Sequence, residues 1–517
     1  MLPKLKLAKY TILLAIAFSA VIVRQPAIPA ERIDFNYSLL GFKIEVEDLE
    51  AFAKRGEISN SLNFYLKRIP SKQTELQKFL SQSYDVDPVL VYRYSRTSVG
   101  IKLLERIGEI IQLPGNLNGF YGLRAAVVQA AESEGINFIE FLKRFPTNIQ
   151  LNLKKLLELV KQISNAEADT KEFIASLPQN NAGKSEFENV ADLSQPGAYP
   201  TVKQTLEFYD RSRQRSLVTD LYLPQGKTDT IATIAISNGL GAKRDRFAQL
   251  ANYLASYGFV VVVPDHPGSD RQRQKAFLQG LYRENFDATD FSDRPRDISF
   301  ILDELERLNP TSFDNKLDLE RVGIFGYSIG GTTALSLAGA EFDFKRLERE
   351  CAKPLNLLNI STLYQCRALE LPRSKRSLKD ERIQAVFAFV PFGNSLFNPQ
   401  QLKEISLPIM FQVVDRDFLT SLLEEQIPLF EALGNDSYLV ISEKLPHSNV
   451  TLSKEQQSSQ AKTFEVAKKY QNILSLVFFQ NYVANNQKYQ PYLGSEYIQA
   501  IEQEPYKLHL IERKALQ

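Results

Sequence analysis

With 517 residues, 62 basic against 61 acidic side chains and a hydrophobic fraction of 44%, the chain is long enough for more than one domain and too apolar to be disordered. The formal net charge of +1 excludes a general electrostatic attraction to nucleic acid, so no nucleic-acid partner is expected. Trp is absent, but 33 Phe and 22 Tyr supply aromatic side chains for a core.

The first 30 residues have the pattern of an export signal. Three lysines precede an uncharged apolar run at residues 11–23, and the stretch Pro26–Ala30 follows. The run is shorter than the roughly 20 residues that a transmembrane helix needs, and cleavage is predicted after Ala30. An uncleaved membrane anchor formed by residues 11–23 is the alternative. In both cases we expect the rest of the chain outside the cytoplasm.

Residues 33–150 carry apolar side chains at helical spacing. The longest stripe includes Leu103, Ile107 and Ile111, and prolines such as Pro70 separate the shorter stripes. We therefore predict a small all-α domain. The segment contains no His and no Cys, so no catalytic constellation is expected in it.

Residues 151–200 are predicted to connect this domain to the rest of the chain. Apolar residues keep a helical spacing from Leu151 to about Phe173. Residues 178–200 are rich in Asn, Ser, Gly and Pro, a composition typical of linkers and surface loops. We expect a bridging helix followed by a linker.

Residues 201–490 change to short apolar runs that alternate with amphipathic helices. Continuous apolar runs are typical of strands buried on both faces of a parallel sheet. We therefore predict an α/β fold, with a mostly parallel sheet covered by helices on both faces and its active site at the carboxyl edge of the strands. Residues 491–517 are expected to be a C-terminal tail. Strands are predicted at 202–209, 217–223, 230–237, 259–264, 321–325, 383–390, 408–414 and 438–442, and helices at 244–257, 297–308, 329–340 and 464–482.

A strand at 322–325 runs into Gly326-Tyr327-Ser328-Ile329-Gly330, and a predicted helix follows. A G-x-S-x-G motif between a strand and a helix is typical of a nucleophilic serine on a tight, strained turn. Ser328 is therefore the predicted nucleophile. The Ile329 amide, at the helix N-terminus, is expected to donate to an oxyanion. Tyr327 is expected to shape the pocket.

The base that activates a serine hydroxyl must be sought among three histidines. His447 is the predicted base, because it follows both Ser328 and the predicted strand at 438–442, as the chain order Ser, Asp, His requires. His266 follows a strand but precedes the nucleophile, so we expect it to shape the pocket or to order a loop. His509 is expected to be structural.

The acid that orients the base is expected just past the strand at 408–414, where Asp415 and Asp417 both lie. A turn of a few residues usually separates the strand from the acid, so Asp417 is preferred and Asp415 is the alternative. The task of the acid is to fix the imidazole tautomer and to stabilise its cation.

A second oxyanion donor is expected in Asn238-Gly239-Leu240-Gly241, which follows a strand and precedes a helix. The Leu240 amide would donate beside that of Ile329, and Asn238 would shape the pocket. A plain glycine-rich turn is the alternative. No segment matches a dinucleotide or P-loop fingerprint and no zinc-type ligand set surrounds a cysteine, so neither a cofactor nor a metal is expected.

Four motifs together resemble the platelet-activating-factor acetylhydrolase and dienelactone-hydrolase-like branch of the α/β-hydrolases. The likeness spans about Thr201 to Tyr482, and the region before it resembles an uncharacterised domain that precedes such hydrolases in some bacterial proteins. The motifs are Asn-Gly-Leu-Gly at 238–241, Asp-His-Pro-Gly-Ser at 265–269, Gly-Tyr-Ser-Ile-Gly-Gly at 326–331 and Pro-His at 446–447.

The resemblance implies an α/β-hydrolase fold in which Ser328, Asp417 and His447 form the triad and Leu240 is an oxyanion donor. Two positions depart from the family pattern. Asn238 stands where the family usually has His, and Val414 stands where it usually has Gly before the acid turn.

Residues 341–382 form an insertion between the helix after Ser328 and the next strand. We expect either a cap that shapes an acyl pocket and touches lipid or an anionic substrate, or a solvated surface excursion. The insertion contains Cys351 and Cys366. In an exported protein this pair is expected to form a disulfide, with two buried free thiols as the alternative.

The implied function is a serine carboxylic-ester hydrolase that works through an acyl-enzyme on small-molecule or lipid esters, phospholipids included, with contact to a membrane surface. Two alternatives remain open. One is a non-catalytic binding protein that uses the fold as a scaffold, and the other is a peptidase or thioesterase variant of the same chemistry.

Overall fold

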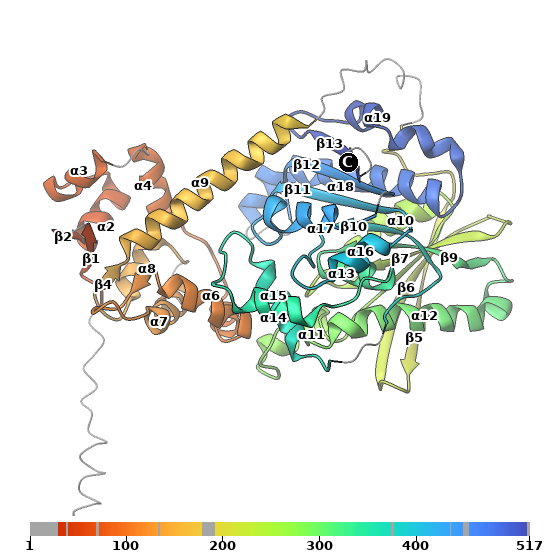
Figure 1. Ribbon diagram of the computed structural model, residues 1–517, viewed down its shortest axis with the longest axis horizontal. Helices are drawn as coiled ribbons and strands as arrows, with labels where there is room; N and C mark the ends of the chain where they lie inside the picture. Colours follow the sequence, from red (N-terminus) through yellow and green to blue (C-terminus); the bar gives the residue numbers. More distant parts are fainter. Residues whose placement is uncertain are drawn as a thin grey trace, which may run out of the picture. The chain divides into compact units, whose positions relative to one another are not determined.

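The computed structural model describes residues 29–37, 40–68, 72–132, 135–177, 192–373, 377–434, 436–447 and 454–513. They form two compact units (Figure 1): the first takes residues 29–91 and 104–157, and the second takes 92–103 and the residues from 158 onward. The apolar run predicted as a signal or an anchor lies outside the described residues. Across the described ranges, no helix is both long and apolar enough to cross a membrane.

The first unit contains a small mixed sheet, so the prediction of an all-α domain is wrong. β1 and β2 form an antiparallel hairpin in which Ile33, Phe35 and Tyr37 alternate with polar residues, a period-two pattern typical of a strand. The other two strands have only two and three residues, too few for a periodic signal. In sheet order the strands are β2 (Leu40–Glu45), β1 (Arg32–Tyr37), β4 (Ile149–Leu151) and β3 (Ile111–Gln112).

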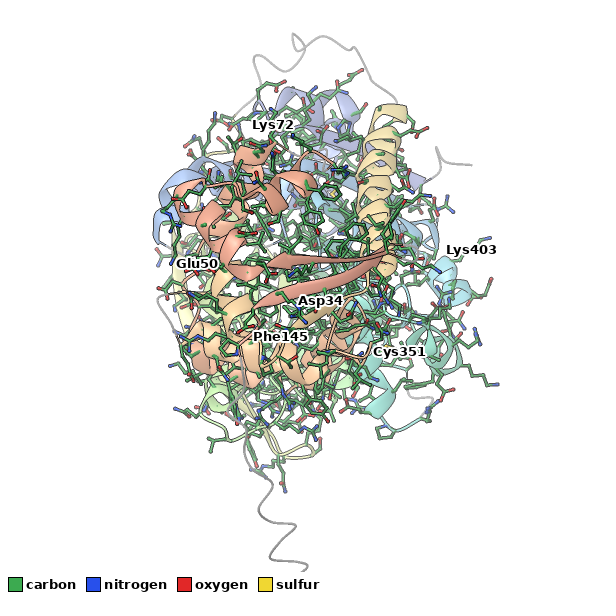
Figure 2. The ribbon with its side chains drawn as sticks, turned by 90° about the vertical axis from the view of Figure 1, so that its left-hand side faces the viewer. Asp34, Glu50, Lys72, Phe145, Cys351 and Lys403 are labelled. Atoms are coloured by element: carbon green, nitrogen blue, oxygen red, sulfur yellow. A yellow bond between two sulfur atoms is a disulfide. The ribbon has the colours of Figure 1, made fainter. Side chains whose placement is uncertain are left out.

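The core of this unit is built around Phe145, which is fully buried. Figure 2 labels it together with Asp34 on β1 and Glu50 on α2. Gly122 is required against it, since a Cβ there would lie 2.5 Å from the Phe145 ring. The helices between residues 46 and 176 are α2 (Val46–Arg55), α3 (Asn60–Leu66), α4 (Gln73–Ser81), α5 (Pro88–Tyr94), α6 (Ser98–Gly108), α7 (Phe120–Ala131), α8 (Phe138–Arg144) and α9 (Leu153–Ser176).

The second unit is built on a nine-stranded sheet, which confirms the predicted α/β architecture. The six central strands, β8 to β12 together with β7, run parallel, and antiparallel strands lie at both edges. In sheet order the strands are β13 (Leu508–Glu512), β12 (Ser437–Pro446), β11 (Ile409–Arg416), β10 (Ile383–Phe389), β9 (Leu317–Tyr327), β7 (Ile231–Ser237), β8 (Val260–Pro264), β6 (Arg215–Pro224) and β5 (Thr201–Asp210).

Helices cover both faces of this sheet. Side chains of β9 alternate between two cores: Val322 and Ile324 pack with α12, α13 and α17, and Phe325 and Tyr327 pack with α10, α18 and α19. Burial on both faces explains the continuous apolar runs of the sequence. The helices are η2 (Arg244–Phe247), α10 (Ala248–Ser256), α11 (Arg271–Leu278), α12 (Asp290–Ser312), α13 (Ile329–Leu337), α14 (Phe344–Ala352), α15 (Ser361–Cys366), η3 (Arg367–Glu370), α16 (Pro399–Glu404), η4 (Leu422–Gln426), α17 (Ile427–Glu431), α18 (Lys454–Tyr482), η5 (Gln487–Leu493) and α19 (Ser495–Ala500).

Two predicted boundaries need correction. Residues 491–517 are not a mere tail, because they supply the edge strand β13, in which His509 bonds to Glu443 at 2.6 Å. Residues 92–103, assigned to the helical domain, fold with the second unit. Polar contacts hold them there, because Arg93 Nε donates to the carbonyl oxygen of Phe277 at 2.8 Å. A single polar contact between distant residues produces no apolar periodicity in the sequence, so the sequence did not predict this boundary.

Candidate active site

The nucleophile motif forms a tight turn between β9 and α13. Ser328 has φ 54° and ψ −117°, a backbone conformation that a non-glycine residue adopts only under strain. Two glycines allow the backbone segments of this turn and of the end of β7 to lie close together. A Cβ on Gly326 would lie 2.1 Å from the Gly330 carbonyl oxygen, and a Cβ on Gly330 would lie 1.9 Å from the Ser237 carbonyl oxygen. The turn therefore places Ser328 at the carboxyl edge of the sheet and at the N-terminus of a helix.

Asp417 and His447 meet at the same edge, because Asp417 directly follows β11 and His447 directly follows β12. His447 Nδ1 lies 2.6 Å from Asp417 Oδ2, and the Asp417 side chain is fully buried. Asp417 also accepts hydrogen bonds from the amides of Leu419 (2.8 Å) and Thr420 (2.9 Å) and from the Thr420 hydroxyl. The carboxylate is thus fixed, and it orients the imidazole with Nε2 turned away from the acid.

His447 also lies beside the nucleophile turn. The Tyr327 hydroxyl donates to the His447 carbonyl oxygen at 3.2 Å, and the centroids of the two rings are 5.6 Å apart. Between the described residues, no hydrogen bond joins the Ser328 hydroxyl to His447. Catalytic hydrogen bonds are often long before substrate binds, so this geometry is compatible with a nucleophile–base pair.

Asp415, the alternative acid, lies elsewhere. Its Oδ1 accepts a hydrogen bond from the Lys444 amide at 2.6 Å, so the side chain contacts the backbone of β12 and not the imidazole of His447. Burial raises the pKa of Asp415 above its ordinary value. Of the two candidate carboxylates, the structure brings only Asp417 to the histidine.

The loop predicted to hold the second oxyanion donor packs against the nucleophile turn. A Cβ on Gly239 would lie 2.7 Å from the Tyr327 ring, and the Gly241 amide donates to the Ser269 carbonyl oxygen at 2.7 Å. Among the described residues, the amides of Leu240 and Ile329 have no hydrogen-bond acceptor. Two amides without acceptors next to a strained serine are what an oxyanion hole requires.

A second Ser–His–Asp arrangement lies beneath this loop. His266 Nε2 is 3.0 Å from the Ser237 hydroxyl, and His266 Nδ1 is 3.1 Å from Asp297 Oδ2. Ser237 and Asp297 are 0% exposed and His266 is 2% exposed, so a substrate carbonyl has no access to Ser237. Of the two roles expected for His266, the structure favours the ordering of a loop.

The expectation that Asn238 shapes the pocket stays a prediction. Its side chain is buried, and neither its amide nitrogen nor its amide oxygen has a hydrogen-bond partner within the described part of the chain. A buried amide without a hydrogen-bond partner is energetically costly, so Asn238 is an unfavourable position within the oxyanion loop.

The insertion is folded and is fastened to the loop that carries Asp417. A disulfide joins Cys351 on α14 to Cys366 on α15, and Figure 2 labels Cys351. The Ser361 amide donates to the Leu419 carbonyl oxygen at 2.8 Å. The buried carboxylate of Glu425 accepts hydrogen bonds from the cap side chains Asn359 (2.8 Å) and Gln365 (3.0 Å). We call residues 341–382 the cap, and the expectation that they shape an acyl pocket stays a prediction.

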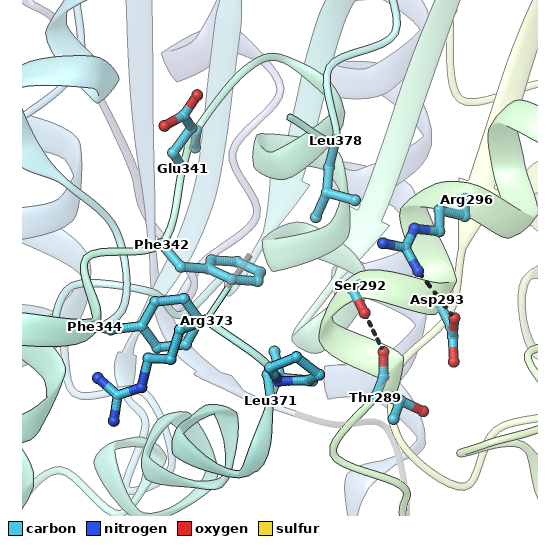
Figure 3. A pocket seen from close by; sticks show the side chains of 12 residues that line it. Thr289, Ser292, Asp293, Arg296, Glu341, Phe342, Phe344, Leu371, Arg373 and Leu378 are labelled. Carbon is cyan, nitrogen blue, oxygen red and sulfur yellow. Dashed lines mark hydrogen bonds and ion pairs between the residues drawn. The ribbon is translucent and has the colours of Figure 1, made fainter. Parts of the chain in front are cut away.

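A cavity of about 260 Å³ lies under the base of the cap. Figure 3 shows Phe342 and Phe344 on one side of it and polar residues of α12, including Asp293 and Arg296, on the other. None of Ser328, Asp417 and His447 lines this cavity, so it is distinct from the candidate active site.

Sequence reasoning missed Arg294, Asp297 and Glu425. Asp290, Arg294 and Asp297 are spaced i, i+4 and i+7 on α12, on the face that buries Ile301. The helix is predicted only from residue 297. Continuing its apolar face back to residue 290 places these charged residues on that face, which is a signal that could have marked them. Glu425 belongs to the single turn η4 and has no such signal.

Comparisons with known families give two matches. Residues 29–152 match a family model described as "alpha/beta hydrolase of unknown function (DUF1400)". Residues 228–347 match a family model described as "serine aminopeptidase, S33". No curated protein matches the chain. The second match includes the oxyanion loop and Ser328, and it ends before Asp417 and His447. With the geometry above, these similarities support a serine hydrolase built on an α/β sheet, and they assign no substrate.

Proposed function

We propose that the chain is a serine carboxylic-ester hydrolase that acts through an acyl-enzyme formed on Ser328. The observation that carries the proposal is the strained turn at Ser328 beside the hydrogen-bonded pair of His447 and Asp417. A base that an acid orients makes a serine hydroxyl nucleophilic, and the strained turn holds that hydroxyl at the same sheet edge.

In the proposed reaction, Ser328 Oγ attacks the acyl carbonyl carbon while His447 Nε2 takes the hydroxyl proton. The carbonyl oxygen becomes an anion, which the amides of Leu240 and Ile329 stabilise. His447 then gives its proton to the leaving alcohol. In the second half, His447 takes a proton from water and the hydroxide attacks the acyl carbon. The bond between the acyl carbon and Ser328 Oγ then breaks, His447 returns its proton to Ser328 Oγ, and a carboxylic acid is released.

The substrates we propose are lipid acyl esters, including phospholipid esters, as for hydrolases similar to platelet-activating-factor acetylhydrolase. Phe418 and Leu419, which directly follow Asp417, are 75% and 41% exposed. Large apolar side chains exposed beside a catalytic acid favour contact with an apolar substrate or a lipid surface. The proposed location is outside the cytoplasm, with residues 11–23 as either a cleaved signal or an anchor.

A second candidate is an aminopeptidase, which the match of residues 228–347 favours. Acyl transfer from an ester and from an amide uses the same nucleophile and base, so the fold does not separate them. The two candidates differ in the leaving group, an alcohol or an amine.

The test combines a fluorophosphonate probe with two substrate panels. We expect an adduct on Ser328, found by mass spectrometry and lost in Ser328→Ala, and we expect faster hydrolysis of p-nitrophenyl esters of graded chain length than of aminoacyl p-nitroanilides. An adduct on Ser237 would contradict the assignment of the nucleophile. Faster hydrolysis of the anilides would favour the aminopeptidase, and a folded chain that forms no adduct would favour the scaffold.

A further inference from the structure

The carbonyl oxygens of the oxyanion loop point at a buried arginine. Arg294 is 1% exposed, and its guanidinium donates hydrogen bonds to the carbonyl oxygens of Asn238 and Gly239, the latter at 3.5 Å. It also donates to the Ser269 hydroxyl at 2.6 and 2.9 Å. The carbonyl oxygen of Ser269 in turn accepts a hydrogen bond from the Gly241 amide. Three of the four loop residues are thus held by Arg294 and Ser269.

The residue left between these anchors is Leu240, whose amide is the proposed oxyanion donor. The Gly239 carbonyl and the Leu240 N–H belong to one trans peptide unit, in which the two groups point in opposite directions. Holding the carbonyl oxygen of Gly239 toward Arg294 therefore directs the N–H of Leu240 away from Arg294. If the carbonyl were released, the peptide plane could turn and the donor would be lost.

We propose that Arg294 is a positioning residue that sets the direction of the Leu240 amide in the oxyanion hole. This role rests on the proposed function above, which assigns the loop to oxyanion stabilisation. A guanidinium suits the task because its planar fork offers five donors, enough to bridge two carbonyls and a hydroxyl at once.

A buried cation needs a fixed counter-charge, and the structure supplies one. Asp290, also fully buried, lies 3.6 Å from the Arg294 guanidinium and accepts a hydrogen bond from the Ser269 hydroxyl. Arg215 contacts Asp290 at 3.4 Å and Asp297 at 3.0 Å. These paired charges share partners, and we call them the charge array: Asp290, Asp297, Arg294, Arg215 and Arg213, which contacts Asp297.

The buried Ser237–His266–Asp297 arrangement is the second support of the loop. Ser237 ends β7, directly before the loop, and its hydroxyl is tied through His266 to Asp297 on α12. Its carbonyl oxygen lies against Gly330 of the nucleophile turn. The arrangement therefore fixes the start of the loop relative to α12, the helix that carries Arg294. Its three side chains are buried, so no substrate reaches them.

The test measures ester hydrolysis and binding of an alkyl boronic acid, which forms a tetrahedral adduct with the nucleophile. For Arg294→Lys we expect kcat to fall about 10²-fold, the effect of losing one oxyanion donor, with KM changed by less than about twofold. The affinity for the boronic acid should fall in parallel with kcat/KM, because both depend on the oxyanion hole.

Arg213→Lys is the matched control. Arg213 belongs to the same charge array and contacts Asp297 at 2.8 Å. Within the described part of the chain, its other polar contacts go to Asp210 and Asp293, and none goes to the oxyanion loop. We expect it to lower the melting temperature while kcat and boronic acid affinity stay within about twofold, as for a residue remote from the transition state. A fall in melting temperature without a fall in kcat for Arg294→Lys would overturn the proposal.

Ser269→Ala keeps the test decisive if Arg294→Lys does not fold. It removes one anchor of Arg294, and we expect kcat to fall about tenfold with boronic acid affinity falling in parallel. Unchanged kcat in this folded variant would also overturn the positioning role. A wild-type chain that forms no adduct on Ser328 and hydrolyses no ester would instead overturn the proposed function itself.

Discussion

At the scale of single residues, the candidate site depends on where a strand stops. Asp415 is still within β11 and its carboxylate bonds to the backbone of the neighbouring strand, whereas Asp417 lies just past the end of β11. Only a residue beyond the strand end is free to turn toward the loop that follows β12, where His447 lies. Two acids two residues apart therefore have different tasks.

Asp417→Asn tests this distinction. The substitution keeps the shape of the side chain but removes the charge that stabilises the imidazole cation, so we expect kcat for ester hydrolysis to fall by roughly 10³- to 10⁴-fold. Asp415→Asn is the matched control and should retain kcat within about threefold, because its partner is a backbone amide. Equal losses in the two variants, measured by initial rates, would remove the assignment of Asp417.

At the scale of elements, one carboxylate fastens the cap to the rest of the catalytic unit. Glu425 is 0% exposed and accepts hydrogen bonds from the amides of Gly393 (2.7 Å) and Asn394 (2.8 Å), in addition to its two contacts in the cap. It lies in η4, a short π-helical turn in the segment that begins with Asp417. Such turns often occur at functional sites.

Glu425→Ala should loosen the cap. It leaves several buried donors without an acceptor, and we expect the free energy of unfolding to fall by about 3 kcal/mol or more. Limited proteolysis should cut within 353–382 faster than in the wild type. The neighbouring Glu424 is exposed, and Glu424→Ala should change the free energy of unfolding by no more than about 0.5 kcal/mol. Unchanged proteolysis in Glu425→Ala would contradict the anchoring role.

At the scale of the whole molecule, the buried charge array links the stability of the fold to pH. Burial, reinforced by the charges of Arg294 and Arg215 and opposed by Asp297, lowers the pKa of His266 to about 4. The folded state therefore binds fewer protons than the unfolded state between pH 6.5 and pH 4. Its stability falls as pH is lowered through this window. Asp290 acts in the opposite sense, because burial raises its pKa to about 6.

His266→Gln isolates this contribution. Glutamine keeps hydrogen-bonding groups but does not titrate, so the variant should lose less stability than the wild type between pH 7 and pH 5. From the shift of the His266 pKa we expect the two losses to differ by about 2 kcal/mol. Urea unfolding at the two pH values measures both. Equal losses would mean that His266 is not the group that titrates.

The sequence by itself determined the features that arise between neighbours in the chain. The apolar runs of the sheet, the turn at Ser328 with its glycines, and the order of Ser328, Asp417 and His447 are local patterns, and the α/β architecture follows from them. The hairpin of β1 and β2 is equally local, but its period-two alternation covers only six residues in each strand and precedes a long series of helical stripes.

Only the tertiary structure decided which side chains meet. Arg294 donates hydrogen bonds to the carbonyl oxygens of residues more than fifty positions away in the sequence. Glu425 accepts hydrogen bonds from the cap and from the loop after β10. The same holds for the choice between Asp417 and Asp415, which depends on the position of His447 after the next strand. Such contacts depend on how helices and loops pack at one edge of the sheet. The spacing of residues along the chain does not determine that packing, so these contacts could not be predicted from the sequence.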